Sequence, residues 1–145
     1  MKKRTIKVVI ALIAVVAMVS AMATVAFAAV YRGTFTRGGV TGNYFASLTC
    51  TTESATAILN ISNFYGTVQS SNVAYLVGEM YGTSPEGVVR MINAFSRKWT
   101  DTPNSGAYSC TGTAKNDKSD YTNIYATADF GINGIAFKSA TVYAN

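Results

Sequence analysis

The side chains that could do chemistry are few in this chain of 145 residues. It contains no histidine, which excludes Ser-His-Asp and Cys-His catalytic arrangements, histidine-containing zinc sites and an imidazole acid–base group. Hydrolysis by paired carboxylates stays open, because the chain has seven acidic residues. Only Glu79 lies in the apolar centre of an expected strand, and no second carboxylate accompanies it. We therefore expect no catalytic residues and no cofactor.

One loop offers oxygen ligands of the kind that calcium prefers. Residues 115–120 read Lys-Asn-Asp-Lys-Ser-Asp, but they lack the alternating ligand spacing and the central glycine of an EF-hand, and they include two lysines. A solvated turn is the better interpretation. We expect no metal site in the chain.

Cys50 and Cys110 are the two cysteines of the chain. A redox-active or nucleophilic thiol would need a second cysteine nearby or a histidine partner, and this chain offers neither. In an oxidising compartment the two can form a single disulfide. Closing a loop of roughly 60 residues would contribute on the order of 4 kcal/mol to the stability of a small domain. The sequence predicts this structural disulfide.

The first 28 residues have the three parts of a secretory signal peptide. Four basic residues among the first seven precede an apolar run over residues 8–19, and small residues follow as far as Ala26 and Ala28. We expect cleavage after Ala28, which leaves one secreted domain over residues 29–145. An uncleaved anchor helix is the alternative, because apolar residues continue for about the 20 positions that a bilayer span needs.

The charge of the expected secreted domain differs from that of the whole chain, whose net charge is +5. Without the four basic residues of the signal segment, eight basic residues face seven acidic ones, and the net charge falls to about +1. Arg97-Lys98 is the only adjacent basic pair that remains. Nucleic acid is therefore an unsuitable partner, because clustered Lys and Arg are needed to bind phosphates. We also expect no stable membrane insertion after cleavage.

Alternation of apolar and polar residues predicts eight short antiparallel strands, separated by breaks that contain Gly, Asn or Ser. In the second strand, for example, Leu48 and Cys50 share one face while Thr49 and Thr51 share the other. Such strands predict an all-β domain, either a two-sheet sandwich or a barrel. The expected strands cover residues 30–37, 44–52, 55–63, 73–81, 88–96, 107–114, 121–130 and 135–143.

The segment Ser84–Phe95 allows two interpretations. It opens with a good helix start and places apolar residues at helical spacing, which indicates a short helix. It can also form the turn and second strand of a hairpin, which we favour. If Tyr81 pairs with Val88, Glu79 then faces Arg90 in an exposed ion pair.

Three short segments resemble an immunoglobulin variable-type domain. Residues 48–50 are similar to its first-cysteine strand, residues 104–110 to the approach to its second cysteine, and residues 130–134 to the bulge that opens its last strand. The resemblance implies an immunoglobulin-like sandwich. No Trp follows Cys50 by a dozen residues, however, and a β protein rich in Ser, Gly and Tyr gives such matches by chance. We assign no family.

Aromatic residues are the remaining candidates for ligand contact. In residues 121–130, Tyr121, Asn123, Tyr125 and Asp129 alternate with small or apolar residues, so we expect them on one solvent-facing side. Two rings roughly 13 Å apart could stack on sugars or anchor a protein, or could serve cross-strand packing alone. Trp99 is a further candidate, as a ligand platform or as part of the surface or core edge.

These observations lead to two expectations for function. The first is a secreted, extracellular binding module for a glycan or a protein surface. The second is a small secreted effector, such as a bacteriocin-like toxin or inhibitor. The near-neutral charge disfavours the second, because membrane attack favours a basic surface or an exposed amphipathic stretch.

Overall fold

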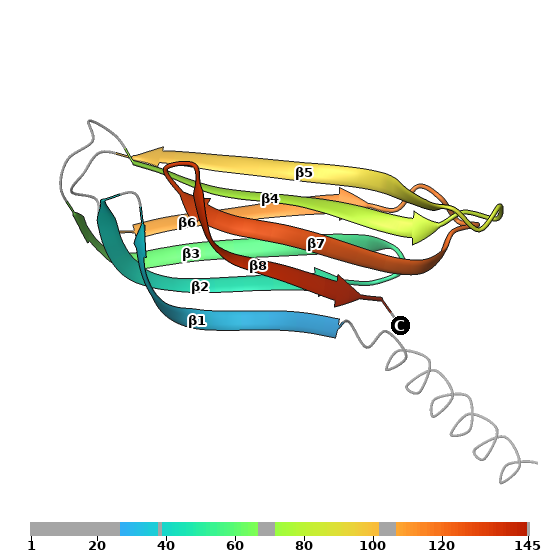
Figure 1. The fold of residues 1–145 in the computed structure, drawn as a ribbon, viewed down its shortest axis with the longest axis horizontal. Coiled ribbons are helices and arrows are strands. Elements are labelled where there is room, and N and C mark those ends of the chain that lie inside the picture. The colour runs from blue at the N-terminus through green and yellow to red at the C-terminus, as the bar shows by residue number, and fades with distance from the viewer. Residues whose placement is uncertain (1–26, 38, 67–71, 102–106, 145) are drawn as a thin grey trace, which may run out of the picture.

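The computed structural model describes residues 27–37, 39–66, 72–101 and 107–144. These residues form eight antiparallel strands in two four-stranded sheets (Figure 1). In these ranges no helix is long and apolar enough to cross a membrane. The strands are β1 (Phe27–Arg37), β2 (Val40–Cys50), β3 (Ser54–Gly66), β4 (Asn72–Thr83), β5 (Val89–Asp101), β6 (Ala107–Lys115), β7 (Thr122–Ile132) and β8 (Ile135–Tyr143).

Sheet A has the strand order β1-β2-β3-β6, and sheet B has the order β5-β4-β7-β8. The chain therefore builds three strands of sheet A, forms the β4–β5 hairpin in sheet B, returns for β6 and ends with the β7–β8 hairpin. The predicted all-β fold is confirmed, and each of the eight expected strands corresponds to an observed one. The two-sheet alternative of that prediction is the one observed.

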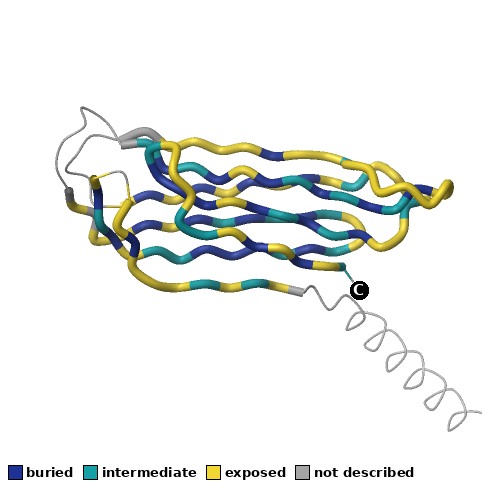
Figure 2. The backbone as a smooth tube through the Cα atoms, in the orientation of Figure 1, coloured by how far each residue is buried: buried dark blue, intermediate teal, exposed yellow. Residues whose placement is uncertain are grey.

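Alternation of side chains places the core between the sheets. Strand β6 shows it most simply, because Tyr108, Cys110, Gly112 and Ala114 are buried while the residues between them are exposed. Figure 2 shows buried residues alternating with more exposed ones along several of the strands, whereas the tube of β5 is mostly exposed. The largest fully buried side chains are Phe130, Leu48, Leu59, Ile61, Leu76, Met80, Ile132, Val40 and Cys50.

Phe95 closes the side of the molecule where β5 lies against β6. Its ring is 5% exposed, although β5 is an edge strand that pairs only with β4. Two glycines make room for the ring: a Cβ added at Gly78 would lie 2.3 Å from the Phe95 ring, and one at Gly112 would lie 2.5 Å from it. Beyond this contact the edge strand is largely exposed, including Arg90, Arg97 and Lys98.

Aromatic contacts close the opposite side, where β1 lies against β8. Phe137 stacks on Phe35 with ring centroids 4.7 Å apart and lies 4.8 Å from the ring of Tyr44. The Lys138 ammonium lies 4.0 Å from the centroid of the Tyr31 ring. This cation–π contact holds β8 of sheet B to β1 of sheet A.

The predicted disulfide is wrong, because Cys50 and Cys110 are both buried free thiols of sheet A. On β3, which separates them, Cys50 pairs with Ala55 and Cys110 pairs with Leu59. The cysteines are thus two strands and four residues apart, about 16 Å at the Cα atoms, whereas a disulfide requires less than about 7 Å. Burial raises the pKa of the Cys50 thiol to about 11 and also raises that of Cys110. Both therefore stay protonated and unreactive near neutral pH.

The strand order also differs from the immunoglobulin pattern that the sequence resembles. In an immunoglobulin domain the two cysteines face each other from opposite sheets, and the second strand pairs with the fifth. Here Cys50 and Cys110 share one sheet, and β2 pairs with β3. Part of one resembling segment, residues 104–106, lies outside the described residues.

The β4–β5 hairpin is confirmed, but its predicted register is wrong. Tyr81 pairs with Met91 and Glu79 pairs with Ala94, so the expected ion pair between Glu79 and Arg90 does not form. The difference begins at the turn, where Thr83 pairs with Val89 and Arg90 therefore pairs with Gly82, three positions from Glu79. A bulge near Met80, with one extra residue in β5, shifts the remaining pairs by one more position.

The predicted signal segment, residues 1–28, lies outside the described residues except for Phe27 and Ala28. These two residues begin β1 and pair with Cys50 and Thr49 of β2. Export of the protein stays a prediction.

Candidate functional site

A row of three tyrosines crosses the outer face of sheet B. Tyr81 of β4 pairs with Tyr125 of β7, which pairs with Tyr143 of β8. The rings of Tyr81 and Tyr125 stack with centroids 5.1 Å apart, and those of Tyr125 and Tyr143 lie 5.4 Å apart. We call these three residues the tyrosine row. Their alignment follows from strand register, because residues directly opposite each other on one face place their side chains in contact.

Stacking decides what the tyrosine row presents to solvent. The interplanar angle of 13° between Tyr81 and Tyr125 means that each ring covers a face of the other. Tyr143 is on the edge strand β8 and is 64% exposed, so one face of its ring has no neighbouring strand. The row thus offers ring edges, hydroxyl groups and one open aromatic face.

The hydroxyl of Tyr81 donates a hydrogen bond to the carboxylate of Glu79, two residues earlier in β4. This bond, together with partial burial, raises the pKa of Tyr81, so the phenol remains a donor. The contact orients the Glu79 carboxylate on the outer face of the sheet.

A shallow hollow of about 300 Å³ lies beside the tyrosine row. Its lining combines small hydroxyl residues at the outward positions of β7 and β8 with the exposed apolar side chain of Val77, and the carboxylates of Glu79 and Asp129 stand at its border. In the part of the chain that the structure describes, Lys118 and Asp117 form the one ion pair, so no cation neutralises these two carboxylates. The hollow can accept hydrogen bonds from a ligand that carries hydroxyl or N–H groups. The hydroxyl residues are Thr127, Ser139 and Thr141.

Two of the predicted site residues belong to this surface. Tyr125 is the central ring of the tyrosine row, and Asp129 lines the hollow. As expected, the alternate residues of β7 face the core: Ile124, Ala126, Ala128 and Phe130 are buried.

Tyr121 and Asn123 do not share that face, and this part of the prediction is wrong. Tyr81 pairs with Tyr125 but Thr83 pairs with Thr122, so β7 contains one extra residue. The backbone φ of Asn123 is 48°, a left-handed conformation that turns the chain at this bulge.

The bulge reverses the direction of the preceding side chain. Tyr121 packs against the core cluster, and its Cβ would lie 3.2 Å from a Cβ added at the buried Gly82. Asn123 is exposed at the bulge, where its Nδ2 lies 3.5 Å from the Thr83 hydroxyl. Of the two predicted tyrosine rings, only Tyr125 is on the candidate surface.

Trp99 lies away from the tyrosine row. It pairs with Ala74, whose side chain is buried, so the two share the core-facing side of sheet B. Since β5 is an edge strand, the indole is still 46% exposed. It occupies the core edge, one of the positions that the sequence left open.

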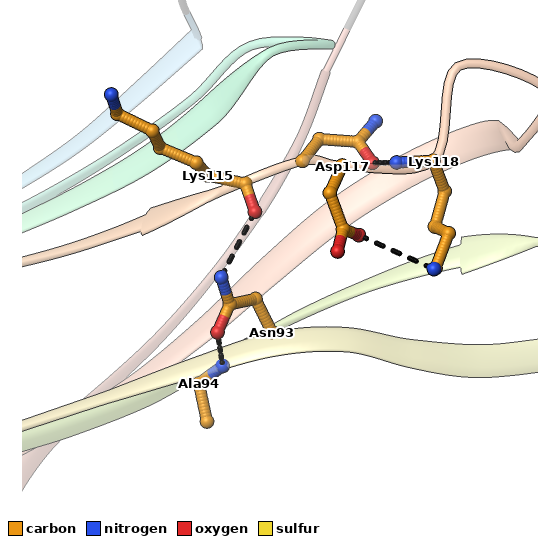
Figure 3. A network of polar contacts seen from close by, with 6 residues as sticks. Asn93, Ala94, Lys115, Asp117 and Lys118 are labelled. Carbon is orange, nitrogen blue, oxygen red and sulfur yellow. Dashed lines mark hydrogen bonds and ion pairs between the residues drawn. The ribbon is translucent and has the colours of Figure 1, made fainter.

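The loop after β6 is a hydrogen-bonded turn (Figure 3). The Asn116 side chain accepts a hydrogen bond from the Lys118 amide at 2.8 Å, and the Lys118 ammonium lies 3.7 Å from Asp117. Nearby, Asn93 of β5 donates to the Lys115 carbonyl at 3.1 Å. Within the described ranges no three His, Cys, Asp or Glu residues gather in a way that could hold a metal ion.

Comparisons with protein-family models, curated proteins and solved structures give no match. The candidate site therefore rests on its geometry. Sequence reasoning missed Tyr81 and Tyr143, and it missed the position of Glu79 at the border of the hollow. Each had a visible signal, an outward position in an alternating strand, but their meeting depends on the pairing of β4 with β7.

Proposed function

We propose that this chain is a secreted, non-catalytic binding module whose ligand site is the outer face of sheet B. The observation that carries the proposal is the tyrosine row beside a hollow lined by carboxylates and hydroxyls. Tyrosine supplies rigid contact area with a polar end, and convergent acceptors give orientation, which together suit recognition.

An extracellular glycan is the ligand class that this chemistry supports best. Sugar hydroxyls can donate to Glu79 and Asp129, and the apolar face of a sugar ring can pack on the open face of Tyr143. A protein surface is the second candidate. It is favoured by Met91, which lies opposite Tyr81, is 55% exposed and extends the row with an apolar side chain.

Pull-down of the purified exported protein on insoluble polysaccharides and cell walls tests the proposal. We expect binding to at least one of them, and a loss of at least about tenfold in affinity for Tyr125→Ser and Tyr143→Ser. Tyr65→Ser is the matched control, because Tyr65 is 67% exposed on β3 of the other sheet. Equal losses in all three variants, or none, would exclude the tyrosine row as the site.

Growth inhibition and dye release from liposomes provide the comparison with an effector function. The proposal predicts neither effect. Dye release at the concentrations that saturate the pull-down would favour the effector instead.

A further inference from the structure

Sheet A has a hollow of its own on the outer face, on the opposite side of the molecule from the tyrosine row. It measures about 580 Å³. Its lining comes from two adjacent rows of paired residues. The rows cross three neighbouring strands, β1, β2 and β3 (Figure 1). The first row is Arg32, Phe45 and Asn60, and the second is Thr34, Asn43 and Ser62.

The guanidinium group of Arg32 is held in place by an aromatic ring. Its central carbon lies 5.3 Å from the centroid of the Phe45 ring. A guanidinium stacked in this way keeps its N–H groups at the edge of its plane, where they can donate to a planar acceptor. On the far side of Phe45, Asn60 accepts a hydrogen bond of 2.7 Å from the Ser109 hydroxyl, which fixes the amide.

The charges on this face are of one sign. None of the four strands of sheet A contains Asp or Glu, whereas Arg32 and Lys115 occupy outward positions. Among the described residues no carboxylate forms an ion pair with Arg32. The rest of the hollow combines the amide and hydroxyl groups described above with apolar surface from Gly33, Tyr44 and Phe45. The site therefore complements a ligand that combines a negative charge with several hydroxyl groups.

We propose that the hollow of sheet A is a second binding site, specific for an acidic sugar unit of an extracellular polysaccharide. The sugar carboxylate lies on the edge of the Arg32 guanidinium, which can bind its two oxygens with two parallel hydrogen bonds. The side chains of Asn43, Asn60 and Thr34 bind the ring hydroxyls. This site goes beyond the proposed function, since it uses another sheet and opposite charge.

Titration of the ¹⁵N-labelled exported protein with oligogalacturonate, followed by NMR, tests this site. We expect shifted amide signals in β1, β2 and β3, and a dissociation constant that rises with salt concentration. Arg32→Gln should weaken binding at least tenfold, and Asn43→Ala should weaken it less. Arg90→Gln is the matched control, because Arg90 is exposed on β5 of the other sheet and its substitution removes the same charge.

Each competing outcome overturns the proposal. It fails if oligogalacturonate causes no shifts, if a neutral oligosaccharide of equal length binds as tightly, or if inorganic phosphate or an acidic peptide binds as tightly. It also fails if Arg32→Gln, shown to be folded by its spectrum, binds as the unaltered protein does. Tyr125→Ser and Tyr143→Ser should leave this titration unchanged, so that failure here and failure of the sheet B site are distinguished.

Discussion

The fit of Phe95 between two glycines predicts how three substitutions depend on one another. A Cβ at Gly112 would lie 2.5 Å from the Phe95 ring and 2.7 Å from a methyl of Leu76, both side-chain atoms. Gly112→Ala should therefore destabilise the fold by about 1–3 kcal/mol, the usual cost of overpacking a core. Phe95→Ala should cost about 3–5 kcal/mol, since it removes a buried ring and leaves a cavity.

The two changes should not be additive. With Ala at position 95 the closest obstacle to the new methyl of Gly112→Ala is gone, and the remaining one, the methyl of Leu76, can shift into the cavity. The second substitution should then cost close to nothing, which corresponds to a coupling energy of about 1–3 kcal/mol in a double-mutant cycle. Urea unfolding of the unaltered protein, the two single variants and the double variant measures this coupling energy, provided that the slope of the unfolding free energy against urea concentration is the same for all four.

Gly78→Ala provides the contrast. A Cβ there would also lie 2.6 Å from the carbonyl oxygen of Thr127, a backbone atom that cannot move aside. This substitution should stay destabilising when Phe95 is replaced by Ala. Equal costs for Gly112→Ala in both backgrounds would refute the reasoning, because the ring would then not be what excludes the methyl.

Three further predictions concern other parts of the fold. Burial raises the pKa of Cys50 from 9.0 to about 11. The stability that the neutral thiol contributes is therefore complete below pH 9, and about 3 kcal/mol of it is lost as the pH rises towards 11. Chemical unfolding across this range should show a smaller loss of stability for Cys50→Ala than for the unaltered protein. A reducing agent should leave the melting temperature unchanged, and thiol titration of the denatured protein should find the thiols of Cys50 and Cys110, a result that a disulfide would contradict. Asn123→Gly should be tolerated while Asn123→Val should cost about 1–3 kcal/mol, since a β-branched residue resists a φ of 48°; equal melting temperatures would argue against the bulge.

The strands could be predicted because alternation is a local property of the sequence. In β6 every second residue is small or apolar, and these residues are the buried ones. The hairpin from β4 to β5 follows from the same local information, with Gly87 at a φ of 79° in its turn. The core-facing side of β7 was also predictable, because Ile124 to Phe130 alternate without interruption.

The two errors in side-chain placement have different causes. The pairing set at the β4–β5 turn places Arg90 opposite Gly82, and an extra residue in β5 adds one more position between Arg90 and Glu79. An extra residue in β7 turns Tyr121 towards the core. A pattern of period two continues past such an insertion as if nothing had happened, yet every side chain beyond it changes face. Asn123, which accepts a left-handed backbone more readily than most residues, is the one local sign of the second bulge.

The sequence contains less information about which strands become neighbours. The disulfide prediction assumed that Cys50 and Cys110 meet, and their separation by β3 within one sheet is a property of topology. For the same reason the tyrosine row could not be foreseen. Its members lie on three strands, and only the register of β4, β7 and β8 aligns them.

The edge strand β5 has a consequence for how copies of this protein behave when they are crowded together. Its outer edge has unpaired backbone groups along 13 residues, which a second copy could extend into a continuous sheet. Arg90, Arg97 and Lys98 along this strand repel the same strand of another molecule, while no acidic side chain precedes Asp101 at its end. Precipitation through this edge is thereby opposed, and it should become easier as added salt screens the three charges.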